Sequence, residues 1–287
     1  MTRPISPPLS RTIRVAHSPD SDDAFMFYAL AGGLVDTPFR YLHEICDIET
    51  LNQRARGGDL EVSAVSIHAY AYLAERYALL ASGASMGDGY GPRLVSRGVR
   101  PGDPRRTLRG RRIAIPGSLT TAHLALRLYQ PDFEPVVMPF DVIEEAVERG
   151  EIELGLLMHE AQLTYADHGL ILWEDLGGWW KSETGLPLPL GGNVVRRDLG
   201  EAVILQVARD VRASVAYALA HRDAALTHAR RFTRGLSEER TDTFVGMYVN
   251  EWTLDYGPVG RQAVQVLLDR GAAAGIIPAG VHVEFVE

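Results

Sequence analysis

Short apolar runs alternate with helix-like segments through the N-terminal two thirds of the chain. A short apolar run bounded by polar or glycine-rich turns predicts a buried strand, and apolar positions three and four residues apart predict a helix. The strands are expected at Thr12–His17, Val62–Ile67, Leu94–Ser96, Ile113–Ile115, Val136–Pro139, Leu154–Leu157 and Val194–Arg196. The helices among them are expected at Ala24–Leu30, His68–Tyr77, Thr120–Tyr129 and Asp141–Arg149.

The remaining segments are predicted to be loops and a helical C-terminal block. Clusters of glycine, proline and tryptophan predict loops at Ser82–Pro92 and Trp173–Leu190, and Arg100–Arg112 is expected to be an exposed connector. Gly150 is expected to end the helix before it. The C-terminal helices are predicted at Glu201–Ala220, Arg222–Phe232, Glu238–Trp252 and Gly260–Ala274.

Strands that alternate with helices are typical of an α/β fold with largely parallel sheets. The alternation occurs in two series before the helical block, so we expect two lobes with a ligand cleft between them. One lobe is predicted to hold residues 11–95 plus 196–287, and the other residues 98–190. The chain is expected to cross between them at Leu94–Arg97 and Gly191–Arg196. Ligands of such folds bind at strand carboxyl ends and helix N-termini.

Composition narrows the class of protein. Apolar residues make up 46% of the chain, which is enough for a core, and 29 basic against 37 acidic residues give a net charge of −8. That charge argues against nucleic-acid binding. The single lysine, Lys181, excludes a Gly-Lys-Ser/Thr phosphate loop, and the single cysteine, Cys46, excludes an intrachain disulfide. We expect a disordered leader at 1–10 without a signal-peptide pattern, no membrane span, and a cytoplasmic location.

Three sets of polar residues follow predicted strands. His159 can act as a base near neutral pH, with an ordinary pKa of about 6.5, or can merely cap or pack against the next helix. Thr120 and Thr121 can form a carboxylate cradle with free backbone N–H groups, or an ordinary helix cap. Ser66 can supply a further hydroxyl to the same pocket, but no Gly-x-Ser-x-Gly elbow surrounds it to make it a nucleophile.

An acidic loop follows the first predicted strand. Asp20, Asp22 and Asp23 can bind a hard cation, but their spacing is not that of an EF-hand, and aspartate commonly caps helices. Several histidines lie at strand ends or in first helical turns, yet the chain has no His-Glu-x-x-His motif. These histidines are His17, His68 and His123. We therefore expect no metal site.

Motifs spread in order along nearly the whole chain carry a family resemblance. The most specific are Thr184–Gly191 (TGLPLPLG) and His159-Glu160. The others are Phe25–Leu30, Asp47–Asn52, Ser66 with Ala69–Ala71, Pro116-Gly117, Thr120-Thr121, Thr164-Tyr165, Gly177, Trp179-Trp180, Arg196–Gly200, Ser214–His221, Tyr248–Asn250 and Leu254-Asp255. Together they resemble the menaquinone-biosynthesis family of the futalosine route, specifically 1,4-dihydroxy-6-naphthoate synthase. The family typically has Ser-Pro-Cys-Pro-Asn-Asp-Thr-Phe where this chain has SPDSDDAF at Ser18–Phe25.

The resemblance implies a two-lobed fold similar to type II periplasmic binding proteins, used as a lyase. It implies cyclic dehypoxanthinyl futalosine as substrate and 1,4-dihydroxy-6-naphthoate as product, with His159 as proton acceptor. The substrate-binding positions that it implies are Ala64, Val65, Ser66, Thr120 and Thr121. Removal of a proton next to a carbonyl, followed by loss of the sugar portion, is driven by aromatisation, so we expect no metal or redox cofactor.

Alternative functions share this fold. One is a sister enzyme similar to chorismate dehydratase, and another is a non-catalytic solute-binding protein, which would need export. A third is a ligand sensor that has lost its chemistry, because the Asp20–Ala24 loop departs from the family pattern. The expected partner is a small-molecule substrate, and the oligomeric state stays open.

Overall fold

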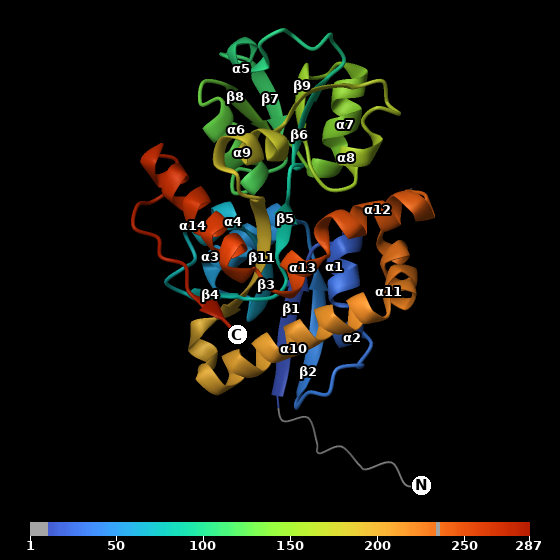
Figure 1. Cartoon of the computed structure of the whole chain (residues 1–287), viewed down its shortest axis with the longest axis vertical. Coiled ribbons are helices and arrows are strands. Elements are labelled where there is room, and N and C mark those ends of the chain that lie inside the picture. The colour runs from blue at the N-terminus through green and yellow to red at the C-terminus, as the bar shows by residue number, and fades with distance from the viewer. Residues whose placement is uncertain (1–10, 234–235) are drawn as a thin grey trace.

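The structure is a computed structural model that describes residues 11–233 and 236–287. Two sheets, each flanked by helices, lie one above the other along the long axis of the molecule (Figure 1). We call the part with residues 11–87, 188–233 and 236–286 the large half, and the part with residues 93–175 the small half. The leader predicted at 1–10 lies outside the described residues.

The large half is built on a seven-stranded sheet with the order β12-β4-β11-β3-β1-β2 and β5 paired to β11. Strands β1, β2 and β3 are parallel, whereas β11 runs antiparallel to β3, β4 and β5. The bounds are β1 Arg11–His17, β2 Phe39–Ile45, β3 Val62–Ser66, β4 Tyr77–Leu80, β5 Ser85–Gly87, β11 Leu188–Arg196 and β12 Phe285–Val286. All five residues of β3 are buried, as expected of a central strand covered on both faces.

The small half has a five-stranded sheet with the order β10-β6-β9-β7-β8. Strand β7 is parallel to β8 and β9, and β6 is antiparallel to β9 and β10. The bounds are β6 Arg93–Ser96, β7 Arg112–Ile115, β8 Glu134–Val137, β9 Leu154–Leu157 and β10 Ile171–Asp175. The predicted α/β fold is therefore confirmed. The expectation of largely parallel sheets is wrong, because β11 and β6 run antiparallel to every strand with which they pair.

Helices flank both sheets, and those of the C-terminal block gather on the large half (Figure 1). Those that precede β11 are α1 Ser21–Met26, α2 Tyr28–Ala31, α3 Ile48–Gly57, α4 Ile67–Tyr70, α5 Pro104–Thr107, α6 Thr121–Tyr129, α7 Phe140–Arg149, α8 Ala161–Thr164 and α9 Leu176–Thr184. Those that follow are α10 Glu201–Ala220, α11 Arg222–Ala229, α12 Glu238–Tyr248, α13 Glu251–Leu254 and α14 Gly257–Ala273, with 3₁₀ turns at Arg197–Leu199 and Arg230–Phe232. As predicted, Gly150 ends α7 in a left-handed conformation.

One hydrophobic cluster continues from the large half into the small half. Tyr70 of α4 and Leu267 of α14 belong to the same cluster of buried residues as Leu126 of α6 and Trp180 of α9. A second cluster, around α1 and α10, lies on the other face of the large sheet. The shared cluster holds the two halves together around the space between their sheets.

The predicted crossings are wrong. Residues 94–96 lie inside β6 and residues 191–196 inside β11, so the chain passes between the sheets at 88–92 and 176–187 instead. Proline and glycine in the TGLPLPLG run suggested a loop, but β11 accommodates Pro189 where its pairing with β5 shifts register. The division into lobes of 11–95 plus 196–287 and of 98–190 stays a prediction.

Further local predictions are wrong. The loop expected at Ser82–Pro92 contains β5. The helix expected at His68–Tyr77 ends at Tyr70, and Tyr77 begins β4 instead. The loop expected at Trp173–Leu190 contains α9, which Asp175 caps by accepting the N–H groups of Gly177 and Gly178. No helix within the described ranges is long and apolar enough to cross a membrane.

Candidate active site

A cavity lies between the two halves. Much of its wall comes from strand ends and from the first turns of helices in both halves, where ligands of α/β folds bind, and Phe244 and Tyr248 of α12 complete it. Its lining residues are Ser18, Asp22, Asp23, Met26, Ile48, Ala64, Val65, Ser66, Gly83, Ser85, Pro92, Thr120, Thr121, Ala122, Met158, His159, Gln162, Leu190, Gly191, Gly192, Asn193, Phe244 and Tyr248. The structure therefore brings together every residue that the sequence predicted for the site.

His159 enters the cavity directly after β9. Its φ of 54° is left-handed, the one such value at a non-glycine position within the described residues. This conformation costs about 1–3 kcal/mol and persists where the surroundings hold it, often at functional sites. The ring packs 4.8 Å from that of Phe140 between centroids, and the His159 carbonyl accepts the N–H of Gln162. The backbone thus fixes the imidazole at the cavity wall.

The partner of His159 is Asp20, which lies on the opposite half. Nδ1 of His159 is 3.1 Å from Oδ2 of Asp20, which is within ion-pair distance. Nε2, on the other side of the ring, is buried and has no hydrogen-bond partner among the described residues. Sequence reasoning considered Asp20 only as a metal ligand or a helix cap, because nothing along the chain links it to a residue so far away.

The acidic loop is buried against the cavity. Burial, followed by the charges of Asp23, Asp20 and Glu160, raises the pKa of Asp22 well above its usual value. Burial likewise raises the pKa of Asp23, although the nearby His17 and the hydrogen bond from Ser18 N oppose the shift. No group of three or more His, Cys, Asp or Glu in the described part of the chain is arranged to hold a metal ion.

Both threonines at the start of α6 lie in the cavity wall, but their hydroxyl groups bind protein atoms. Thr120 Oγ1 accepts the N–H of His123 and donates to the Gly117 carbonyl, so it caps the helix. Thr121 Oγ1 accepts the N–H of His68 and donates to the Leu190 carbonyl, which joins α6 to the large half. The backbone N–H groups of Thr121 and Ala122 have no partner within the described residues. A ligand anion would meet these amides rather than the hydroxyls.

The segment from Ala64 to Ser66 forms the floor of the cavity at the end of β3. These residues pair with Asn193, Gly192 and Gly191 of β11. Ser66 is held by the side chain of Asn52, whose Oδ1 accepts Ser66 N and whose Nδ2 donates to Ser66 Oγ.

Sequence reasoning missed several polar residues of the wall, among them Gln162, Asn193 and Tyr248. Asn193 donates Nδ2 to the Gly83 carbonyl, while its buried Oδ1 has no partner in the described part of the chain. Tyr248 donates its hydroxyl to Oε1 of Gln162 across the two halves. The signal for Tyr248 was its place among the family-like motifs, whereas Asn193 directly follows TGLPLPLG and Gly192 and reads as an ordinary strand residue.

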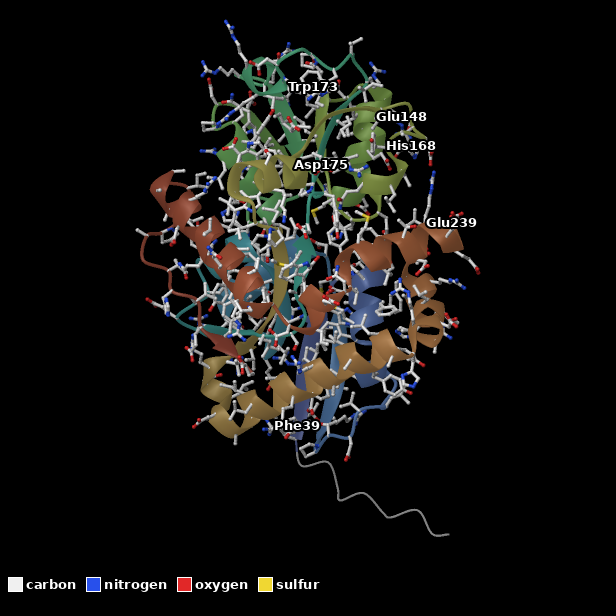
Figure 2. The ribbon with its side chains drawn as sticks, viewed as in Figure 1. Phe39, Glu148, His168, Trp173, Asp175 and Glu239 are labelled. Atoms are coloured by element: carbon white, nitrogen blue, oxygen red, sulfur yellow. The ribbon has the colours of Figure 1, made fainter. Side chains whose placement is uncertain are left out.

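One exposed pair of titratable groups lies away from the cavity. His168 is bound to Glu148 on the outer side of the small half, and Figure 2 shows the two side by side. No lysine or arginine is among the described residues that line the cavity. The positive end of the α6 dipole and His159 are therefore the groups there that favour an anionic ligand.

The fold and the site define a two-sheet α/β protein with the periplasmic-binding-protein-like fold and a histidine in its cleft. A solved Candida albicans protein described as having the generic periplasmic binding protein fold has a TM-score of 0.72 and 13% identity, over 94% of this chain and 92% of its own. A solved structure from Archaeoglobus fulgidus has a TM-score of 0.88 and 48% identity, over 93% of this chain and 98% of its own.

The chain belongs to the menaquinone biosynthesis family, whose model matches residues 13–273. A relative from Thermus thermophilus, named 1,4-dihydroxy-6-naphthoate synthase, is 44% identical over 92% of this chain and 95% of its own length. A relative of the same name from Streptomyces coelicolor is 38% identical over 93% of this chain and 95% of its own length. The family resemblance predicted from the sequence is confirmed.

Proposed function

We propose that this chain is a lyase that converts cyclic dehypoxanthinyl futalosine into 1,4-dihydroxy-6-naphthoate during menaquinone biosynthesis. The observation that carries the proposal is His159, held at the cavity wall with Nδ1 toward Asp20 and Nε2 without a partner in the described part of the chain. The names of the two relatives and the family match support the same activity.

His159 acts as the general base in this proposal. Its Nε2 takes a proton next to a substrate carbonyl, after which the sugar portion leaves and the second ring becomes aromatic. A positioned base contributes about 10²–10⁴-fold to such a step. Because aromatisation drives the release, the reaction as we propose it uses no metal or redox cofactor.

The substrate carboxylate binds at the N-terminus of α6. The free N–H groups of Thr121 and Ala122 point along the helix axis, where the positive end of the helix dipole favours an anion. Ala64, Val65 and Ser66 then support the rest of the substrate from the other half. Thr120 and Thr121 serve in substrate binding by shaping this helix end.

The acidic loop is compatible with an anionic substrate. With raised pKa values, Asp22 and Asp23 favour the protonated, uncharged form more than ordinary carboxyls do, which reduces repulsion of a carboxylate. Protonated carboxyl groups can also donate hydrogen bonds to substrate oxygens. We therefore infer that the departure from the family pattern in this loop changes the contacts with the substrate and does not abolish activity.

We further propose that the protein acts in the cytoplasm, where a free thiol such as Cys46 is ordinary. Its partner is the small-molecule substrate. In this proposal the two sheets are the cores of two lobes, and the cavity between them excludes water from the reaction when the lobes are together.

The test is to incubate the purified protein with cyclic dehypoxanthinyl futalosine and to follow naphthoate release by liquid chromatography. A parallel incubation with chorismate tests the sister activity of a dehydratase. We expect naphthoate from the first substrate and no conversion of the second. Conversion of chorismate, or tight binding of the futalosine derivative without turnover, would instead favour the dehydratase or the solute-binding alternative.

A further inference from the structure

The side chain of Asp20 is buried, but it makes no helix-capping hydrogen bond that would explain its burial. It is 1% exposed and stands at the N-cap position of α1, where an aspartate usually accepts N–H groups of the first turn. Its side chain makes no such cap bond. Neither carboxylate oxygen meets hydrogen-bond geometry with any described group, and the Nδ1 of His159 at 3.1 Å is its ion-pair contact.

The surroundings of Asp20 make its position costly unless a cation or a strong donor faces it. A buried carboxylate without compensation loses its hydration, and here further carboxyl groups lie close by. The charge of Asp20 contributes to the raised pKa of both Asp22 and Asp23, which shows that the three groups repel one another. Among the described residues, His159 is the group at ion-pair distance from Asp20.

We propose that Asp20 is the positioning residue of His159, fixing its proton on Nδ1 so that the lone pair of Nε2 is presented to the substrate. This inference rests on the proposed function for the role of the base. A neutral imidazole carries one proton, and a carboxylate beside Nδ1 holds it there. When Nε2 accepts the substrate proton, the ring becomes a cation next to the Asp20 carboxylate, which stabilises it.

The pair is assembled across the two halves. Asp20 follows β1 of the large half, and His159 follows β9 of the small half. Ser21, the next residue, donates its hydroxyl to Glu160 at 3.1 Å, so adjacent residues on both sides make a second contact between the halves. Asp20 therefore contacts His159 only when the two halves are packed together around the cavity. Separation of the halves would break this contact.

The first measurement is the tautomer of the His159 ring in the unmodified protein, from ¹⁵N–¹H long-range correlation spectra at a pH where the ring is neutral. The His159→Asn spectrum identifies the signals, because they are absent from it. We expect the proton on Nδ1. A ring protonated on Nε2 overturns the proposal, and this result does not depend on the substrate or on any variant of Asp20.

The second measurement is turnover of Asp20→Asn, with Asp210→Asn as a matched control at a buried aspartate that binds Thr37 and Tyr41 away from the cavity. Asp20→Asn keeps the shape and removes the charge. We expect kcat to fall at least about 10-fold, toward the ~10⁴-fold known for the corresponding change in a Ser-His-Asp triad, with KM little changed. Asp210→Asn should retain kcat near the unmodified value.

An Asp20→Asn variant that keeps the unmodified kcat also overturns the proposal. If the unmodified protein fails to release naphthoate, the proposed function is wrong. The tautomer measurement still shows whether Asp20 fixes the proton of His159 on Nδ1. Circular dichroism of each variant confirms that turnover is compared between folded proteins.

Discussion

Gly177→Ala is expected to destabilise the protein strongly, because backbone occupies the space that a side chain there would need. A Cβ at Gly177 would lie 1.9 Å from the Tyr90 carbonyl oxygen and 2.0 Å from its carbonyl carbon. Ordinary contact begins at 3.4 Å, so the backbone at Tyr90 must retreat by about 1.5 Å. Neither a rotamer change nor a flexible side-chain end can relieve this contact.

The magnitude follows from the cost of overpacking. Inserted methylene groups typically cost about 1–3 kcal/mol, and a clash between backbone atoms belongs at the upper end, near 3 kcal/mol. In a protein of this size each 1 kcal/mol lowers Tm by about 2–4 °C. Thermal unfolding followed by circular dichroism should therefore show a fall in Tm of about 6–12 °C. Because Tyr90 packs edge-on against Tyr248 of the cavity wall, KM should rise as well.

Gly178→Ala is the matched control on the same helix. The nearest atom to a Cβ there, the Gly89 carbonyl oxygen, lies at 3.5 Å, so alanine fits. Alanine is also favoured over glycine inside a helix by up to about 1 kcal/mol, so Tm should stay the same or rise. Equal effects of the two substitutions would refute the reasoning, because they would show that the close approach of α9 to residues 90–91 does not govern stability.

Two further perturbations test the acidic loop and the start of α6. Burial and neighbouring charges raise the folded-state pKa of Asp22. Protonated Asp22 therefore stabilises the folded protein at low pH, and this stabilisation is lost as the pH rises through the folded-state pKa. Asp22→Asn should thus match the unmodified protein in urea unfolding at low pH and be more stable at neutral and alkaline pH; a variant less stable at alkaline pH would contradict this sign. Thr120→Ala removes the α6 cap and should lower the free energy of unfolding by about 1 kcal/mol, whereas Thr120→Ser should not. Loss of turnover in Thr120→Ala at unchanged KM would argue against a role in substrate binding.

The helices and strands with strong apolar patterns were predictable. The long helix Glu201–Ala220 has the predicted bounds, and β9 matches because its four residues are all apolar or glycine and all buried. Strand β2, with the sequence FRYLHEI, was not predicted, because it is the edge strand of the large sheet and most of its side chains are partly exposed. Pattern reasoning finds buried segments and misses those that face water.

The site was predictable in part for the same reason. His159, Ser66 and Thr120 each follow a buried strand, and strand ends of an α/β fold meet at one edge, so their approach could be inferred from separate segments. The contact between Asp20 and His159 could not, because it depends on how two independently patterned halves pack together. The hydrogen bonds that both threonine hydroxyls donate could likewise not be predicted, because their acceptors are the backbone carbonyls of Gly117 and Leu190.

The most direct test of the central claim is the turnover of His159→Asn with cyclic dehypoxanthinyl futalosine. Asparagine keeps a hydrogen-bonding side chain and can adopt the left-handed backbone that His159 holds, but it cannot take a proton. We expect the variant to fold and to bind substrate, measured by calorimetry, while kcat for naphthoate release falls at least about 10²-fold. A variant that releases naphthoate at nearly the unmodified rate would show that the base lies elsewhere and would contradict the account.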